Sequence, residues 1–505
     1  MKRSLFFLLV IGMTGLNQAQ DISDALLYSA SDILGTARYN ALGGSFSALG
    51  GDLSAIGTNP AASAVFMYNT TAFTFVFDEV KNDATYFGTT ARSSESDFDI
   101  SQAGATFIVY GNPGTKGVQK VTIGFNYNMM ANHDNRLFFN GNGDSTVADL
   151  FLNAAQGIPL QDLELQQGET ISFLYGYLGN TQGTRAQNAF LGYQGYIIDP
   201  VEDSSNNTQY VSNVASGRFN QSYEKITRGY NGKYSFNASM QVNDRFYLGL
   251  NLNSDIIDYW ETSFLNETNS NNGSSVSRIG FENTLSSRGY GFSAQFGAIV
   301  KLTNSLRMGL SYDTPTWYNI YEETTQYLAT TRQENGSSIS AVVNPAIINI
   351  FPRYDFNSPG RFGAGLAYVF GQSGLLSFDY SYRDYSNMKF KPEYDASFSN
   401  LNSAISSTMQ GASTFRLGGE YRFKGLSFRG GYVYEDSPYK DDSLMSARNT
   451  YSFGLGYSFG TYYFDATYSW ADRDRMEQLY NTGLTDSALV STRDQHFMFT
   501  LGFNL

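Results

Sequence analysis

The two histidines are the residues of this chain with the most obvious capacity for acid–base chemistry. His133 lies in the polar stretch NMMANHDNR, and His496 begins the last alternating segment. Nucleophilic hydrolases need a nucleophile beside a base that a third group orients. Ser and Asp are abundant, but the chain has no Cys, and its one GxSxG run, at 456–460, ends at a predicted hairpin turn and so forms no strand-to-helix nucleophile elbow. We therefore expect no catalytic residue and no enzyme activity.

Iron or metal binding is the second chemistry to consider. Without Cys there is no thiolate metal site and no structural disulfide. Heme binding stays open as a lesser alternative, because His133, His496, Tyr or Met could supply an axial ligand. Their spacing is not diagnostic of heme. We expect no cofactor and no metal site.

Seven charged residues share one face of their predicted strands. On the lipid face of a membrane strand, Arg would cost roughly 2–4 kcal/mol at mid-depth. An inward position lets these groups pair with one another or with whatever fills the interior. These predicted lumen charges are Asp379, Arg383, Arg416, Glu420, Arg422, Arg429 and Asp465.

A strict alternation of large and small residues positions such charges. From Tyr451 to Trp470, rings and aliphatic groups alternate with Ser, Gly, Thr and Asp, and the chain turns at Gly460 and Thr461. A period of two places the rings on one face and Asp465 on the other. No separate set of apolar helices covers the apolar face, so lipid is the fitting neighbour. The pattern predicts an all-β, antiparallel transmembrane β-barrel.

The composition agrees with such a barrel. Charged residues make up only 16% of the 505 residues, aromatic residues 16%, and the mean hydropathy is −0.30. A soluble domain carries about 25% charge, and a helical membrane protein is more hydrophobic. The net charge of −13 argues against a nucleic-acid partner.

The first 19 residues predict a secretory signal peptide. Lys2 and Arg3 precede the mostly apolar residues 5–16, and Ala19 suits a small-residue cleavage site. This apolar run is too short to span a bilayer. Export together with barrel periodicity predicts the outer membrane of a Gram-negative bacterium, with its lipids as neighbours.

Connection lengths predict the number of strands. Short Gly-, Asn-, Asp- and Ser-rich turns are expected at 111–119, 242–246, 301–306, 371–374, 423–426 and 459–462. Long connections are expected at about 80–100, 132–225, 264–278, 328–358, 386–412, 437–447 and 473–493. Short periplasmic turns that alternate with long extracellular loops predict 14 strands, with both ends periplasmic. The final strand, which alternates from Phe497 to Leu505, resembles the signal read by the barrel-assembly machinery. We expect a monomer.

Residues 20–70 differ from the barrel wall. They are dense in Gly, Ala and Ser, with isolated larger residues, and include the triplet Asn59, Pro60 and Ala61. Small residues let backbones approach closely, and about 50 residues are too few for an independent core. The segment is predicted to fill the lumen as an N-terminal hatch, ahead of a barrel at 71–505.

At this point the sequence resembles the FadL-type (FadL/TodX) family of outer-membrane channels for long-chain fatty acids and other hydrophobic compounds. The resemblance lies in Asn59-Pro60-Ala61 after a Gly-rich run, in FDYSYRDYSNMKF at 378–390, and in FRGGYVYEDSPY at 428–439. It implies a 14-stranded barrel, cargo capture by extracellular loops, a pocket beside the hatch, and a lateral exit. The pocket candidates are the larger hatch residues Phe46, Leu49, Ile56 and Phe66. The family's exit depends on a kink in the third strand; Gly124 lies there, but the sequence does not locate an opening.

The long connection at 132–225 has two interpretations. A helix is expected at 146–156, with Val147, Leu150 and Phe151 on one face. These residues are candidates for the capture surface. The same loop could instead form a partner surface, because some barrels of this kind act in protein secretion or surface assembly. That alternative stays open beside passive uptake of a hydrophobic small molecule.

Overall fold

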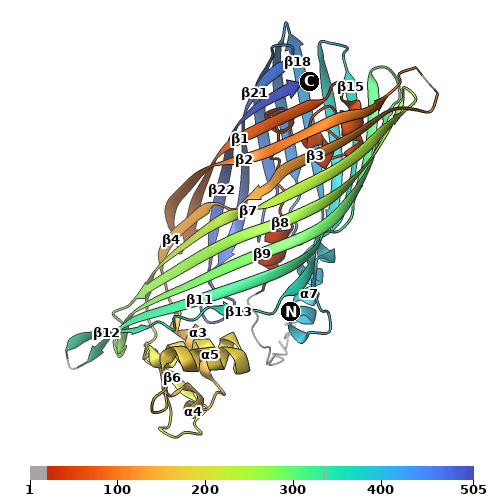
Figure 1. The fold of residues 1–505 in the computed structure, drawn as a ribbon. Helices are drawn as coiled ribbons and strands as arrows, with labels where there is room; N and C mark the ends of the chain where they lie inside the picture. The colour runs from red at the N-terminus through yellow and green to blue at the C-terminus, as the bar shows by residue number, and fades with distance from the viewer. Residues whose placement is uncertain (1–19, 115, 335) are drawn as a thin grey trace, which may run out of the picture.

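The computed structural model describes residues 20–505 except 115 and 335, so the predicted signal peptide lies outside it. The chain forms a closed antiparallel barrel (Figure 1). The barrel closes where β1 (Thr70–Tyr86) pairs with β22 (Ser487–Asn504), from Thr70↔Asn504 to Thr85↔Leu489. Backbone N–H and C=O groups are thereby paired across this seam, as lipid requires.

Fourteen strands cross the barrel, as predicted. Ten are continuous: β1, β2 (Thr89–Gly111), β7 (Phe219–Val242), β8 (Phe246–Thr268), β9 (Val276–Lys301), β18 (Gly411–Phe423), β19 (Leu426–Glu435), β20 (Arg448–Ser458), β21 (Tyr462–Gln478) and β22. Four are interrupted: β3 (Val118–Asn132) with β4 (Asn135–Gly143), β10 (Leu306–Asp313) with β11 (Trp317–Glu334), β14 (Tyr354–Asn357) with β15 (Arg361–Val369), and β16 (Gly374–Asp384) with β17 (Lys389–Lys391). The shorter β12 (Ser337–Val343) and β13 (Asn349–Ile350) pair with β11, and β5 (Ile198–Pro200) pairs with β6 (Tyr210–Ser212).

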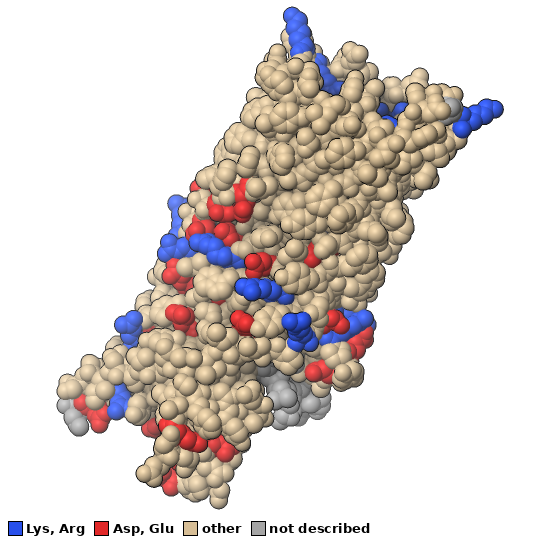
Figure 2. Space-filling view, viewed as in Figure 1, with Lys and Arg blue, Asp and Glu red and all other residues tan. Residues whose placement is uncertain are grey.

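The period of two decides which side chains face outward. On β1, Phe73, Phe75 and Phe77 are exposed, whereas Thr74 and Val76 between them are buried. β20 and β21 are the twelfth and thirteenth strands, and they have the predicted register, with Tyr451 opposite Trp470. Figure 2 shows an outer surface almost free of charge over the upper part of the barrel. No helix within the described residues is long and apolar enough to cross a membrane.

The predicted long connections are wrong at four places where strands continue. At 328–358, β11 runs on to Glu334 and pairs with β12. β1 and β2 run through 80–100 and turn tightly at Phe87 and Gly88. The loops predicted at 264–278 and 473–493 shrink to 269–275 and 479–486. In these segments the outward face changes from aromatic to polar, so the hydrophobic alternation stops while the hydrogen-bonded ladder continues.

The helices lie inside the barrel or at its end with the long loops (Figure 1). The hatch contains α1 (Ile22–Tyr28), α2 (Ala37–Ala41) and the 3-10 helices η1 (Ser54–Gly57) and η2 (Pro60–Val65). A cap at the loop end contains α3 (Ala148–Ala155), α4 (Leu160–Leu163), α5 (Ile171–Gln182) and α6 (Thr184–Gln194). The 3-10 helix η3 (Tyr385–Asn387) and helix α7 (Ala396–Thr408) follow β16. A closed barrel with a lipid-facing belt makes this protein an outer-membrane β-barrel.

Candidate functional site

The hatch rests on glycines of the barrel wall. A Cβ added at Gly309 would lie 1.8 Å from the Ser47 carbonyl oxygen, and one at Gly431 would lie 2.4 Å from the Gly43 nitrogen. Wall residues Gly249, Gly297, Gly365, Gly418 and Gly454 approach hatch atoms in the same way. Because glycine has no side chain, the hatch backbone comes into direct contact with the wall.

Asn59, in the triplet that carries the family resemblance, ties the hatch to two strands. Its Nδ2 lies 3.1 Å from the carbonyl oxygen of Ala298 on β9 and 3.3 Å from that of Leu310 on β10, and it donates to the Ser47 carbonyl oxygen within the hatch at 2.7 Å. Its Oδ1 accepts a hydrogen bond from the Ala61 amide at 3.1 Å, which caps η2. Pro60 stands at the first position of η2, where its missing N–H is not needed.

The pocket candidates Phe46, Leu49, Ile56 and Phe66 are all buried in the hatch. Phe46 and Leu49 pack with wall residues of β15 and β16, and Ile56 and Phe66 pack with Ala72 of β1. Ligand contact by these four residues stays a prediction, since each is covered by protein in this conformation.

The predicted lumen charges hold the hatch. Glu420 is buried among Arg422, Arg429 and the hatch residue Arg38, whose Nε lies 2.9 Å from Glu420 Oε2. Arg429 also pairs with Asp465 at 2.5 Å. The sequence interpretation missed the hatch partner, because Arg38 is 382 residues away from Glu420.

Two further members of this set bond to the hatch backbone, and a third stays within the wall. Asp379 accepts a hydrogen bond from the Ser47 amide at 2.7 Å. Arg383 donates to the Ser29 carbonyl oxygen at 3.0 Å. Arg416 donates to Ser381 Oγ at 3.0 Å and stays within the wall. Three of the seven predicted lumen charges, Glu420, Asp379 and Arg383, thus bond to the hatch, and the other four pair within the wall.

An aromatic chamber occupies the loop end of the lumen. We use this name for the cluster of buried side chains that includes Tyr28, Tyr259, Tyr318, Tyr354, Phe356, Phe390 and Phe398. Tyr28 of α1 lies edge-on to Phe356, with ring centroids 5.6 Å apart. The hydroxyls of Tyr28 and Tyr354 both donate to Glu322 at 2.6 Å. Helix α1 therefore packs among apolar side chains that surround one polar group. Sites for small molecules have the same combination of apolar walls and few polar groups.

Asp24 makes the packing of α1 in the lumen depend on pH. Burial raises the pKa of Asp24 well above its ordinary value, and nearby Asp21 and Glu322 raise it further. A carboxyl group with a raised folded pKa stabilises the folded form while protonated, and this contribution is lost as the pH rises above the unfolded value of about 3.9. We expect amide hydrogen exchange in α1, corrected for its intrinsic pH dependence, to be faster at pH 8 than at pH 5. Asp24→Asn should remove the difference; an unchanged difference would contradict this assignment.

The third crossing strand is broken between β3 and β4, at His133 and Asp134. Backbone pairing between β2 and β3 covers only Gln102–Gly111 of β2. Between Thr89 and Ser101, β2 has no backbone partner on that side. β4 pairs only with β7, and side chains replace the missing ladder: Asn82 of β1 donates to the Arg136 carbonyl oxygen at 3.0 Å.

Gly229 of β7 holds this wall break. Its carbonyl oxygen accepts from the His133 amide, and its amide donates to Asp134 Oδ1, both at 2.8 Å. Gly229 has a φ of +113°, and a Cβ there would lie 2.0 Å from the Asp258 carbonyl oxygen. Across the break, Arg228 of β7 pairs with Glu95 of β2 at 2.7 Å. The wall is therefore joined here by side chains instead of a backbone ladder.

The hatch lies directly against the wall break. The Asp32 amide donates to the Met130 carbonyl oxygen at 2.6 Å, beside the irregular register between Met129 and Ala131. Asn231 of β7 donates to the Leu27 carbonyl oxygen at 2.8 Å. A small polar cavity of about 40 Å³ separates the hatch from the wall at this level. Gly124, which the sequence did not single out as a kink, lies elsewhere in β3. The polar run that contains His133 coincides with the break.

The two histidines serve different parts of the wall. His133 Nε2 lies 3.0 Å from Asn231 Oδ1, and His496 Nδ1 lies 2.5 Å from Asp78 Oδ1. Within the described part of the chain, no three His, Cys, Asp or Glu residues are arranged to hold a metal ion.

Comparison with known proteins finds solved structures that have a similar fold. No protein-family model matches the chain. No curated protein matches it by sequence. The crystal structure of a Pseudomonas aeruginosa FadL homologue is similar over 94% of this chain and 99% of that one, with a TM-score of 0.52 and 11% identity. The Pseudomonas putida toluene transporter TodX covers the same shares, with a TM-score of 0.50 and 12% identity. The chain therefore has the FadL-type fold.

Proposed function

We propose that this protein is a passive outer-membrane channel for hydrophobic small molecules, with long-chain fatty acids among its candidate cargoes. The observation that supports this most directly is the order of features along the lumen. The aromatic chamber, the first helix of the hatch and the wall break follow one another without a separating strand. Toluene is what the similar TodX transports by its description, and an apolar cargo suits such a chamber.

The proposed route leaves the barrel sideways. A cargo that displaces α1 enters the aromatic chamber, and movement of the segment around Asp32 uncovers the wall break. From there it passes between β2 and β4 into the membrane. Each CH₂ of the cargo gains about 0.8 kcal/mol on leaving water. A path that avoids the charged lumen around Glu420 is therefore favoured over a path through the whole barrel.

The cap supplies the proposed entry surface. Val147, Leu150 and Phe151 are buried in the packing core of the cap, so contact with cargo would require the cap to open. Phe173 and Tyr177, one turn apart on α5, are 61% and 54% exposed. We place first contact with cargo on these two rings, because exposed aromatic pairs mark binding surfaces.

Uptake by cells tests this proposal. In a Gram-negative strain that lacks its own channel of this kind, expression should accelerate uptake of a labelled fatty acid or toluene. Asp97→Trp places a ring on the lumen face of β2 beside the wall break and should lower uptake about tenfold, the equivalent of roughly 1.4 kcal/mol. Ser96→Trp, on the outer face of the same strand, is the matched control. Equal uptake with and without the protein, or equal uptake by both variants, would contradict the channel or the lateral route respectively.

A further inference from the structure

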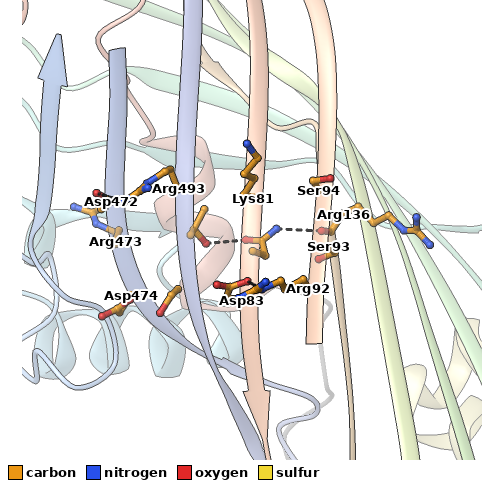
Figure 3. A pocket seen from close by; sticks show the side chains of 13 residues that line it. Lys81, Asp83, Arg92, Ser93, Ser94, Arg136, Asp472, Arg473, Asp474 and Arg493 are labelled. Atoms are coloured by element: carbon orange, nitrogen blue, oxygen red, sulfur yellow. Dashed lines mark hydrogen bonds and ion pairs between the residues drawn. The ribbon is translucent and has the colours of Figure 1, made fainter. Parts of the chain in front are cut away.

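The outer face of the barrel has a charged cavity of about 840 Å³ where β21, β22, β1, β2 and β4 meet (Figure 3). Its lining includes five Lys or Arg side chains and three Asp side chains. Two more carboxylates lie beside it, because Glu79 pairs with Lys81 and Glu224 pairs with Arg136. The cavity thus gathers several cations at one place on a chain whose net charge is −13. The volume lies within the range of about 300–1,000 Å³ typical of ligand sites.

The wall break creates this cavity. β4 pairs only with β7, while the β1–β2 hairpin continues past it without a backbone ladder. Asn82 closes the floor: its Nδ2 donates to Asn135 Oδ1 at 2.7 Å, and its Oδ1 accepts from Thr492 Oγ1 at 2.8 Å. The floor is thus sealed by hydrogen bonds, and the cavity is a feature of the outer surface, separate from the lumen.

The cavity lies at the edge of the lipid-facing belt. Along β1 the outward residues run Phe77, Glu79, Lys81, and along β22 they run Phe497, Gln495, Arg493. In Figure 2 charged side chains gather below the uncharged part of the wall, toward the end with the long loops. That end faces outward in an outer-membrane barrel. Lipid headgroups of the outer leaflet lie at this level, and acyl chains lie over Phe77 and Phe497.

We propose that this cavity binds the phosphorylated headgroup of an outer-leaflet glycolipid of the lipid A class. Lys81, Arg92 and Arg493 would hold phosphate, with Arg136 at the rim (Figure 3). Arginine binds phosphate in a bidentate way, and lysine acts as a point charge.

The ion pairs already present are compatible with this ligand. Arg92 pairs with Asp83 at 3.0 Å, and Arg493 pairs with Asp472 at 2.6 and 3.1 Å. Lys81 pairs with Glu79 at 2.9 Å, and Arg136 pairs with Glu224 at 2.7 Å. Exposed pairs of this kind contribute about 0–1 kcal/mol, so phosphate oxygens can share or replace the carboxylates. A soluble phosphate would gain only these polar contacts. A glycolipid would also cover the exposed rings of Phe77 and Phe497. For this reason the ligand we propose is a glycolipid and not a soluble phosphate.

Binding measurements on the detergent-purified full-length protein test the proposal. By native mass spectrometry, bis-phosphorylated lipid A should bind the wild type at least ten times more tightly than the Lys81→Gln/Arg92→Gln/Arg493→Gln variant. Dephosphorylated lipid A should bind both proteins equally weakly. Arg288→Gln is the matched control, because Arg288 is an exposed, Asp-paired side chain on β9 outside the cavity, and it should bind like the wild type.

Two outcomes would overturn the proposal: equal binding of bis-phosphorylated lipid A by the wild type and the triple variant, or binding of inorganic pyrophosphate as tight as that of the lipid. If the triple variant does not fold, the single variant Arg92→Gln tests the site. The Arg92 side chain is 85% exposed, so its replacement should not disturb folding. A threefold or larger loss of affinity supports the site, and unchanged affinity contradicts it.

Discussion

Replacing Gly431 by valine should open the barrel to small polar solutes. A Cβ at this position would lie 2.4 Å from the Gly43 nitrogen and 2.5 Å from Ser452 Oγ. The hatch backbone must then move away from the wall, at an overpacking cost of about 1–3 kcal/mol. At about 1.4 kcal/mol per factor of ten, the undocked population rises roughly 5- to 150-fold. Uptake of a polar chromogenic substrate by intact cells measures the leak.

Gly430→Val is the matched control for this experiment. Gly430 precedes Gly431 on β19, and a Cβ there meets no atom closer than 3.9 Å. It should leave permeability unchanged. Deletion of residues 20–58 sets the upper limit of the leak. A Gly431→Val protein as tight as Gly430→Val would show that the hatch does not seal the lumen at this level.

Replacing Glu420 by glutamine should destabilise the protein by about 3–5 kcal/mol, the range for removal of one partner from a buried charge cluster. The carboxylate is fully buried and meets three guanidinium groups, of which Arg38 and Arg429 are themselves largely buried. Glutamine keeps the shape and removes the charge, so within the described residues Arg38 loses the one carboxylate with which it forms an ion pair. Urea unfolding in detergent micelles, followed by tryptophan fluorescence, measures the change.

Glu393→Gln provides the comparison for a surface ion pair. Glu393 pairs with Lys389 at 3.4 Å, with both side chains about half exposed, and its loss should cost less than about 1 kcal/mol. A double-mutant cycle between Glu420→Gln and Arg38→Gln should show strong coupling. Additive effects would mean that Glu420 stabilises the wall alone and does not anchor the hatch.

The alternating segments allowed the barrel to be predicted from sequence. Between Tyr451 and Trp470 the period of two is a local property, and a membrane strand needs only that alternation to place its rings in lipid. The same reasoning predicted Asp465 and Glu420 on the lumen face, and the structure buries both side chains. It failed at 80–100, where Lys81 and Arg92 face the headgroup level, because polar residues on both faces carry no hydrophobic signal.

The partners of these residues came only from the tertiary structure. Glu420 meets Arg38, the Asp32 amide meets the Met130 carbonyl oxygen, and Gly431 meets Gly43. Each contact joins the hatch to a wall strand distant in sequence. The chain contains 50 glycines, so the sequence around any one of them does not indicate that it faces the hatch.

By itself the sequence determined an exported, 14-stranded barrel with a small-residue segment inside it, since strand periodicity and turn chemistry act over a few residues. Only the tertiary structure decided where the wall breaks, what fills the aromatic chamber and where the charged outer cavity lies. These features arise from closure of the barrel around the hatch. Closure brings residues that are far apart in the sequence to within hydrogen-bonding distance. No local sequence pattern indicates which residues will meet in this way.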